Sequence, residues 1–181
     1  MMHTLIHWDQ QLFWLINHAH NRPLDWLMLT VTSLGELAAV WWVVAGVVLF
    51  ADRKNGKRVA LLLVIALLLT YLLDNFLLRH LWVRQRPYLA LHAVHRLGVL
   101  WAGSSFPSGH ASSVIAVSIV LRRYYRRLTV PLVVFAALTL VSRPYLGMHY
   151  PLDVLAGGAS GVCAGCVVLW LARRKHGPLD T

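Results

Sequence analysis

Two short patterns in the sequence combine residue types that could carry nucleophilic chemistry. His149 and Asp153 are four residues apart at the start of an apolar run, and in a helix this spacing places both side chains on one face. A carboxylate beside one imidazole nitrogen would fix the tautomer and leave the other nitrogen free to act as nucleophile or base. Ser108, Gly109 and His110 open an earlier apolar run. Amides at a helix N-terminus attract anions, glycine permits close approach, and this second histidine could protonate a leaving oxygen.

Three arginines accompany these patterns along the chain, namely Arg79, Arg86 and Arg143. A planar guanidinium group matches the oxygens of phosphate two at a time. Taken singly, each residue has a simpler explanation, because an arginine at a helix end often extends to the membrane interface and Ser108 can be an ordinary helix cap. Gathered at one membrane face, however, the arginines and histidines predict a site for a highly charged anion such as phosphate.

The elements that must position these residues are expected to be membrane-spanning helices. The chain has 181 residues, of which 58% are hydrophobic and only 13% are charged, about half the charged fraction of a soluble domain. The two cysteines are too few for a disulfide framework. The composition therefore excludes a soluble or disordered protein and a nucleic-acid-binding module, despite a net charge of +10. We expect an all-α integral membrane helical bundle with five to six transmembrane helices, forming a single membrane-embedded domain over residues 1–181.

Most of the positive charge lies in three basic clusters, at residues 53–58, 122–127 and 173–175, each next to an apolar run. Basic residues that flank membrane spans mark the cytoplasmic side, so all three clusters are predicted to lie inside. This places the candidate site residues at the outer ends of the helices. The predicted spans are residues 27–51, 58–79, 108–122, 128–145 and 150–172, and residues 80–107 form an outer loop.

The N-terminal segment over residues 4–16 has two interpretations. Its apolar residues alternate with polar ones such as His7, Asp9 and Gln10. This pattern fits either an amphipathic helix lying in the membrane interface or a sixth, short span. It lacks the basic start and clean apolar core of a signal peptide.

Three features inside the predicted spans are expected to be structural. Glycines that recur every four residues predict close packing of the last span against another helix, and a C-x-x-C pair in the same span is expected to pack rather than bind zinc or act in redox chemistry. A carboxylate deep in the second span is expected to hydrogen-bond to another helix, in preference to selecting the lipid. These residues are Gly157, Gly161 and Gly165, Cys163 and Cys166, and Asp74.

The site residues match, in order, the three-part signature of the type-2 phosphatidic acid phosphatase superfamily of membrane lipid phosphatases, which the chain resembles over most of its length. The first motif, Lys, six residues, then Arg-Pro, reads Arg79 to Pro87 here, with arginine in place of the lysine. Pro-Ser-Gly-His is intact at residues 107–110, and Ser-Arg, five residues, His, three residues, Asp is complete over residues 142–153. Arg84 lies outside the motif and is left out of the predicted site.

The resemblance implies metal-independent hydrolysis of a phosphate ester or anhydride, with no cofactor. His149 would attack phosphorus and form a phosphohistidine, Asp153 would orient it, and His110 would protonate the leaving group and later activate water. Phosphate oxygens would be held by Arg79, Arg86, Ser108, Gly109 and Arg143. Preorganised donors at such oxygens are commonly the largest catalytic contribution. The seven acidic residues show no cluster that would bind a divalent metal.

The compact chain is most similar, within the superfamily, to bacterial undecaprenyl-diphosphate phosphatases. This implies hydrolysis of undecaprenyl diphosphate to undecaprenyl phosphate, in a multi-pass protein of the bacterial inner membrane with its site facing the periplasm. The partners would be a lipid phosphate and membrane lipids, with no nucleic acid, and the sequence does not define the oligomeric state. Phosphatidylglycerophosphate, phosphatidate or lipid A phosphatase is the alternative. A lipid-phosphate transporter or scramblase is the alternative of a different class.

Overall fold

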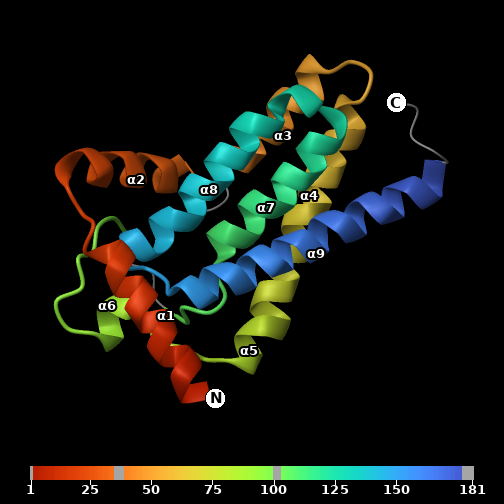
Figure 1. Ribbon diagram of the computed structural model, residues 1–181. Coiled ribbons are helices and arrows are strands. Elements are labelled where there is room, and N and C mark those ends of the chain that lie inside the picture. Colours follow the sequence, from red (N-terminus) through yellow and green to blue (C-terminus); the bar gives the residue numbers. More distant parts are fainter. Residues whose placement is uncertain (1, 35–38, 100–102, 177–181) are drawn as a thin grey trace.

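The computed structural model describes residues 2–34, 39–99 and 103–176, and helices dominate these ranges (Figure 1). The long helices alternate with short helical turns around the candidate site. In chain order they are α1 (Met2–Asn17), α2 (Arg22–Leu34), α3 (Ala39–Ala51), α4 (Gly56–Leu72), the π-helical turn η2 (Leu73–Leu78), α5 (Arg79–Leu81), α6 (Pro87–Ala90), α7 (Gly109–Tyr124), the 3-10 turn η3 (Arg126–Leu128), α8 (Thr129–Tyr145) and α9 (Pro151–His176).

The helices form a membrane bundle, as predicted. Within the described ranges, three helical segments are long and apolar enough to cross a membrane: Gly56–Leu81, Arg126–Tyr145 and Pro151–Arg174. A shorter apolar helix covers Val40–Ala51, within α3. Helix α7 lies in the middle, where it packs against α4, α8 and α9, and its buried valines at 114, 117 and 120 follow the helical repeat that one buried face requires.

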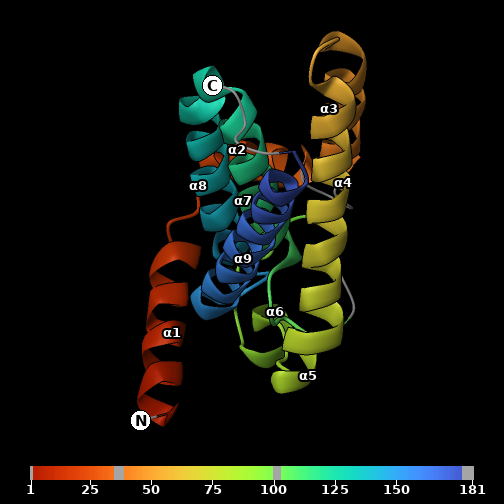
Figure 2. The same ribbon diagram turned by 90° about the vertical axis from the view of Figure 1, so that its right-hand side faces the viewer.

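The predicted first span over residues 27–51 is wrong, because the described parts of this range belong to two helices. Helix α2 lies across the bundle beside α8, whereas α3 runs along it and forms a hairpin with α4 (Figures 1 and 2). The difference has a polar cause. Thr32 of α2 is buried and its hydroxyl is 2.9 Å from that of Ser142 in α8, so α2 packs sideways against the end of α8 instead of continuing the direction of α3.

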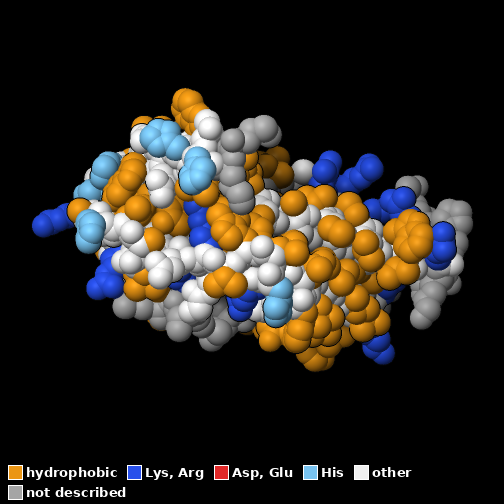
Figure 3. Space-filling view, turned by 90° about the horizontal axis from the view of Figure 1, so that it is seen from below, with side chains coloured by type: hydrophobic (Ala, Val, Ile, Leu, Met, Phe, Trp, Pro, Cys, Tyr) orange, Lys and Arg blue, Asp and Glu red, His pale blue; other side chains and the backbone are white. Residues whose placement is uncertain are grey.

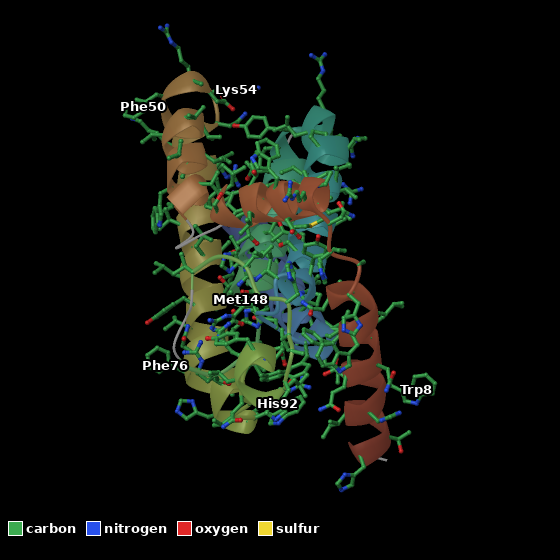
Figure 4. All side chains as sticks on the ribbon, turned by 90° about the vertical axis from the view of Figure 1, so that its left-hand side faces the viewer. Trp8, Phe50, Lys54, Phe76, His92 and Met148 are labelled. Atoms are coloured by element: carbon green, nitrogen blue, oxygen red, sulfur yellow. The ribbon has the colours of Figure 1, made fainter. Side chains whose placement is uncertain are left out.

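The three basic clusters lie together at one end of the bundle, and the candidate site lies towards the other. The clusters lie in the α3–α4 connection, in the α7–α8 connection and in the last turns of α9. The site residues lie towards the opposite ends of these helices. Figure 4 shows Lys54 at one end and His92 near the other, with Met148, the neighbour of His149, between them. Basic clusters and site residues thus lie at different ends of the helices, as the charge pattern predicts, except in the part of the first span now assigned to α2. Which end faces the cytoplasm stays a prediction.

Helices α7 and α9 approach closely through the predicted glycine face. A Cβ atom on Gly161 would lie 3.0 Å from Cβ of Ile115 and even closer to the carbonyl oxygen of Ser112, and Gly165 stands in the same relation to Ile119. Only glycine permits this separation, so the packing interpretation is confirmed. The interpretation of the cysteine pair is wrong: both thiols are free and exposed on another face of α9.

Asp74 ties three helices together inside the bundle. Its carboxylate accepts a 2.5 Å hydrogen bond from the hydroxyl of Ser112 in α7 and a 2.7 Å bond from that of Ser160 in α9. The expected hydrogen bond to another helix is confirmed, and it extends to two helices.

The N-terminal segment forms one continuous helix, α1, beside the site end of the bundle (Figure 2). Its Leu5, Trp8, Leu12 and Leu15 are exposed along one stripe, and Trp8 points away from the bundle (Figure 4). The opposite side carries Asp9, Phe13 and Asn17, which are buried. The two faces fit a helix that contacts lipid on one side and the bundle on the other.

Candidate active site

The three sequence motifs converge in space at the N-terminal end of α7. The loop before α7 pairs with the loop before α6, since the amide of Ser105 donates to the carbonyl of Arg84 at 2.7 Å. The same loop joins α9, because the amide of Ser108 donates to the carbonyl of Asp153 at 3.0 Å. Segments that are distant in sequence are thus held together by backbone hydrogen bonds, which fix their relative positions more firmly than side-chain contacts alone.

His149 lies in the turn between α8 and α9 with only 3% of its surface exposed. Its Nδ1 atom is 2.7 Å from the carbonyl oxygen of Ser105, and its Nε2 atom is 3.2 Å from Nη1 of Arg86. A carbonyl can only accept, so Nδ1 carries the proton and Nε2 keeps its lone pair. Burial, together with the positive charges of Arg143 and Arg86, lowers the pKa of His149 well below its usual value. The imidazole is therefore neutral at physiological pH.

A cavity of about 570 Å³ opens beside this imidazole. Six of the eight predicted site residues line it, and they come from α5, the residue before α6, α7, α8 and the turn before α9. These six are Arg79, Arg86, Gly109, His110, Arg143 and His149. The remaining two, Ser108 and Asp153, are fully buried behind it.

Several polar atoms around the cavity have no hydrogen-bond partner within the described part of the chain. These buried atoms are Nε of Arg79, Nε of Arg86, Oγ of Ser108 and Nε2 of His110. Four such polar groups at one place are costly in a folded protein unless water or a bound ligand completes their hydrogen bonds. Because three of the four belong to donors and two carry positive charge, the arrangement fits an anion with several oxygens.

The end of the molecule near α5 and α6 is compatible with the approach of such an anion. In the view onto this end, histidine and basic side chains are visible among apolar ones, and no acidic side chain of a described residue is in view (Figure 3). A surface of one sign favours counter-ions of the opposite sign.

The cavity also has an apolar wall. Trp42 of α3 and Leu67, Leu68 and Tyr71 of α4 line it together with the arginines. Trp42, Leu68 and Tyr71 have 50–58% of their surface exposed, so this wall continues onto the lipid-facing side of the bundle. The cavity therefore joins a polar, anion-binding end to the hydrocarbon region of the membrane.

Asp153 does not have the partner that the sequence predicts. The structure places the Ser105 carbonyl, in place of the Asp153 carboxylate, at Nδ1 of His149. The carboxylate instead accepts from the Ser105 hydroxyl at 2.6 Å, the Tyr150 amide at 2.9 Å and Nη1 of Arg84 at 2.9 Å. Asp153 therefore acts on the imidazole only through Ser105. Its carboxylate accepts from the Ser105 hydroxyl, and the Ser105 carbonyl accepts from His149.

Sequence reasoning missed four residues near the site. Arg84, which lies outside the motif, is buried and contacts Asp153, and the hydroxyl of Thr32 accepts from Nη1 of Arg143 at 3.1 Å. Ser105 and Asp9 complete the set. Arg84 lies on the predicted outer side, against the usual bias of basic residues, and this position was the signal in the sequence that it has a role. A buried arginine must be paired with acidic groups.

Gly147 shapes the turn that carries His149. It has φ +74°, and a Cβ atom there would lie 2.7 Å from Cγ1 of Val94 and 3.0 Å from the carbonyl oxygen of His95. The left-handed conformation and the close approach both require glycine. This turn links the arginine at the end of α8 to the histidine before α9, so its conformation sets their separation.

The donor set around the cavity suits an anion and not a metal ion. Among the described residues, no group of three or more His, Cys, Asp or Glu side chains is arranged to hold a metal. Positive charge at the site comes from arginine side chains.

The sequence and structure both match known membrane phosphatases. The family model of the PAP2 superfamily matches residues 59–176. Undecaprenyl-diphosphatase BcrC of Bacillus subtilis is 32% identical over 146 residues, which are 81% of this chain and 74% of that protein. Lipid A 4'-phosphatase of Bacteroides thetaiotaomicron is 30% identical over 185 residues, covering 96% of this chain and 80% of that protein. The crystal structure of Aquifex aeolicus LpxE superimposes with a TM-score of 0.77 at 28% identity, covering 89% of this chain and 94% of that one.

The fold and site thus define a membrane-embedded lipid phosphatase. The chain belongs to the PAP2 superfamily, as its motifs indicate. A phosphatase is favoured over the transporter or scramblase that the sequence left as an alternative.

Proposed function

We propose that the protein hydrolyses undecaprenyl diphosphate to undecaprenyl phosphate through a phosphohistidine on His149, at the outer face of a bacterial inner membrane. The observation that carries the proposal is the position of Nε2 of His149, an unprotonated nitrogen 3.2 Å from Arg86 at the edge of the anion cavity. The similarity to an undecaprenyl-diphosphatase over most of both chains supports the substrate.

In the first step, Nε2 of His149 attacks the terminal phosphorus. The new N–P bond forms as the bond to the bridging oxygen breaks, and His110 donates its proton to that leaving oxygen. The equatorial oxygens gain negative charge in this step, and they face Arg79, Arg86 and Arg143 around the cavity. Gly109 begins α7, and its amide lies at a helix N-terminus that favours the same charge. The amide of Ser108 is already bonded to the Asp153 carbonyl, so Ser108 contributes through its hydroxyl.

In the second step, water attacks the phosphohistidine. His110, now unprotonated, takes a proton from that water, the N–P bond breaks, and inorganic phosphate leaves. His149 returns to the neutral state in which Nδ1 donates to Ser105. Every proton moved is carried by a histidine or by water. Arg79, Arg86 and Arg143 line the cavity and supply positive charge to the phosphoryl oxygens.

The apolar wall supports a lipid substrate. A tail that begins at the phosphates would pass Trp42, Leu68 and Tyr71 to reach the hydrocarbon region, and no water-soluble phosphate ester needs such a wall. The basic clusters at the opposite end of the bundle support an outward-facing site, because they favour the cytoplasmic side.

The proposal is tested by measuring phosphate release from purified protein in detergent. Undecaprenyl diphosphate, phosphatidylglycerophosphate, phosphatidate and lipid A are compared with EDTA present throughout. We expect undecaprenyl diphosphate to have the highest kcat/KM. A preference of tenfold or more for another lipid, about 1.4 kcal/mol in transition-state binding, would overturn the substrate, and loss of activity in EDTA with recovery in Mg²⁺ would overturn the metal-free mechanism.

The nucleophile is tested with His149→Ala, and His92→Ala is the matched control because His92 is exposed in the outer loop. The first variant is expected to release no phosphate and to leave no label on the protein after incubation with terminally labelled substrate. The second is expected to behave as wild type. Release by His149→Ala at the wild-type rate would refute the role of His149.

Lipid A is the second candidate substrate. The lipid A 4'-phosphatase relative covers more of this chain than the undecaprenyl-diphosphatase relative does, and Aquifex aeolicus LpxE superimposes over 94% of its length. The substrate panel separates the two candidates directly.

A further inference from the structure

A buried bridge of charges connects α1 to the site, outside the residues of the three motifs. Arg84 donates from Nη2 to Oδ2 of Asp9 at 2.6 Å and from Nη1 to Oδ1 of Asp153 at 2.9 Å. The Arg84 side chain is 8% exposed, and both carboxylates are fully buried. One guanidinium fork thus spans two acids that lie 144 residues apart in sequence, at positions 9 and 153.

Both carboxylates of the bridge have hydrogen bonds to their second oxygen as well. The second oxygen of Asp9 accepts from the amide of Leu152 at 2.8 Å, in the first turn of α9, and the second oxygen of Asp153 accepts from Ser105 and from the amide of Tyr150. A buried carboxylate tolerates its charge only when its oxygens are hydrogen-bonded in this way.

Aromatic rings hold the guanidinium group of Arg84 in place. Its Cζ atom lies 3.6 Å from the ring centroid of Tyr150 and 4.5 Å from that of Trp82. The backbone of Arg84 is held as well, because its amide donates to Oγ of Ser104 and its carbonyl accepts from Ser105. An arginine fixed by its backbone, two carboxylates and two rings has little freedom left, so it can transmit position between the elements it joins.

The bridge leads to the nucleophile through Ser105. Arg84 fixes Asp153, the Asp153 carboxylate accepts from the Ser105 hydroxyl at 2.6 Å, and the Ser105 carbonyl accepts from Nδ1 of His149 at 2.7 Å. A shift of Asp153 would therefore move the carbonyl that sets the orientation of the imidazole. Arg86, by contrast, contacts His149 from the cavity side, so the two arginines act on opposite edges of the same ring.

We propose that Arg84, clamped by Asp9 of α1, is a positioning residue that holds Asp153 and Ser105 so that Nε2 of His149 faces the phosphorus. This rests on the proposed function of His149. Helix α1 is then part of the catalytic apparatus, and it acts on the rate of attack and not on the binding of phosphate.

The test compares Asp9→Asn, Arg84→Lys and the double variant in purified full-length protein. Asp9→Asn leaves one guanidinium group facing one carboxylate. Arg84→Lys keeps the positive charge but has a single ammonium in place of the two-armed guanidinium. In both variants a buried cation still faces a buried carboxylate. The control is Asp25→Asn, which removes a carboxylate that accepts from the Tyr145 hydroxyl at 2.7 Å and lies 3.4 Å from Nε2 of His95. Among the described residues, Asp25 is not one of the hydrogen-bond partners of Asp153. For each protein, kcat, KM and the inhibition constant of inorganic phosphate are measured.

We expect kcat to fall about tenfold in Asp9→Asn and about 10²-fold in Arg84→Lys, the loss expected from a misplacement on the order of 1 Å. The double variant is expected to have a kcat no lower than that of Arg84→Lys, because both substitutions break the same bridge. Inhibition by inorganic phosphate is expected to be unchanged, since Arg79, Arg86 and Arg143 stay in place. Asp25→Asn is expected to keep the wild-type kcat.

Two results would overturn the inference. One is a wild-type kcat in both single variants. The other is a fall in kcat with an equal weakening of phosphate inhibition, which would mean that the substitutions distort the whole site. His149→Ala separates this test from that of the proposed function: if it still releases phosphate, the proposed function fails, whereas an inactive His149→Ala with active bridge variants overturns only the role of Arg84.

Discussion

Replacing Gly157 by alanine is expected to disturb the site through the contact between α7 and α9. A Cβ atom on Gly157 would lie 3.1 Å from the carbonyl carbon of Ser108 and 3.2 Å from Cβ of Ala111, and closer still to the Ser108 carbonyl oxygen. Relief requires the start of α7 to move by several tenths of an ångström. Such overpacking costs about 1–3 kcal/mol.

The neighbouring glycine provides a matched control. A Cβ atom on Gly158 would meet nothing within 4 Å, so Gly158→Ala adds the same methyl group to the same helix without a clash. Alanine is favoured over glycine in a helix by about 1 kcal/mol. Gly158→Ala should therefore be at least as stable as wild type, while Gly157→Ala should be less stable.

The movement also has a catalytic consequence. Ser108 is held by its amide, which donates to the Asp153 carbonyl at 3.0 Å, and the amide of the neighbouring Gly109 faces the phosphate in the proposed mechanism. Displacing them is expected to lower kcat/KM in Gly157→Ala by about tenfold to 10²-fold, with wild-type activity in Gly158→Ala.

The assay combines thermal unfolding in detergent with phosphate release. A destabilisation of 1 kcal/mol lowers the unfolding midpoint by about 2–4 °C in a protein of this size, so the two variants should differ by several degrees. Equal midpoints and equal activities for Gly157→Ala and Gly158→Ala would refute the reasoning, because the added methyl group would then have met no obstacle.

Three further predictions concern the turn and the arginine at the end of α8. Because burial and nearby arginines lower the pKa of His149 from its usual 6.5, the imidazole stays unprotonated below that pH. The acid limb of the kcat/KM profile should then lie below pH 6.5, and a midpoint at or above it would contradict the structure. Gly147→Ala should lower both the unfolding midpoint and kcat, since a left-handed residue costs alanine about 1–2 kcal/mol before the contact with Val94 is relieved; an unchanged midpoint would show that the turn tolerates a side chain. Thr32→Val removes the hydroxyl that accepts from Arg143 and should lower kcat/KM by about tenfold, in the range of one hydrogen bond to a charged group, whereas wild-type kinetics would show that Arg143 is positioned without α2.

The sequence was sufficient for the parts of the site that contact the anion cavity. Residue type and motif predict Arg86, Arg143, His110 and His149, and all four line one cavity. They could be named from the sequence because each lies in a local pattern, such as a spacing of four residues or a helix start. Their catalytic roles stay predictions.

The sequence was insufficient where the structure depends on long-range pairs. Nothing local connects Asp9 to Arg84, or either of them to Asp153, because their pairing exists only after α1, the outer loop and α9 have packed. The contact of Thr32 with α8 could not be predicted for a related reason. Hydropathy is averaged over a window of residues, so a buried threonine counts the same as a threonine that faces lipid.

The size of the cavity sets how much of a lipid the protein touches. A volume of about 570 Å³ matches a drug-sized ligand, and the polyprenyl diphosphate proposed as substrate is larger than that. Most of a polyprenyl tail would therefore remain among its neighbours in the bilayer during turnover. The protein would meet its substrate by lateral diffusion in the membrane and would not extract it from the bilayer. It would contact only the first isoprene units, so analogues with short tails should be hydrolysed as well as the full-length lipid.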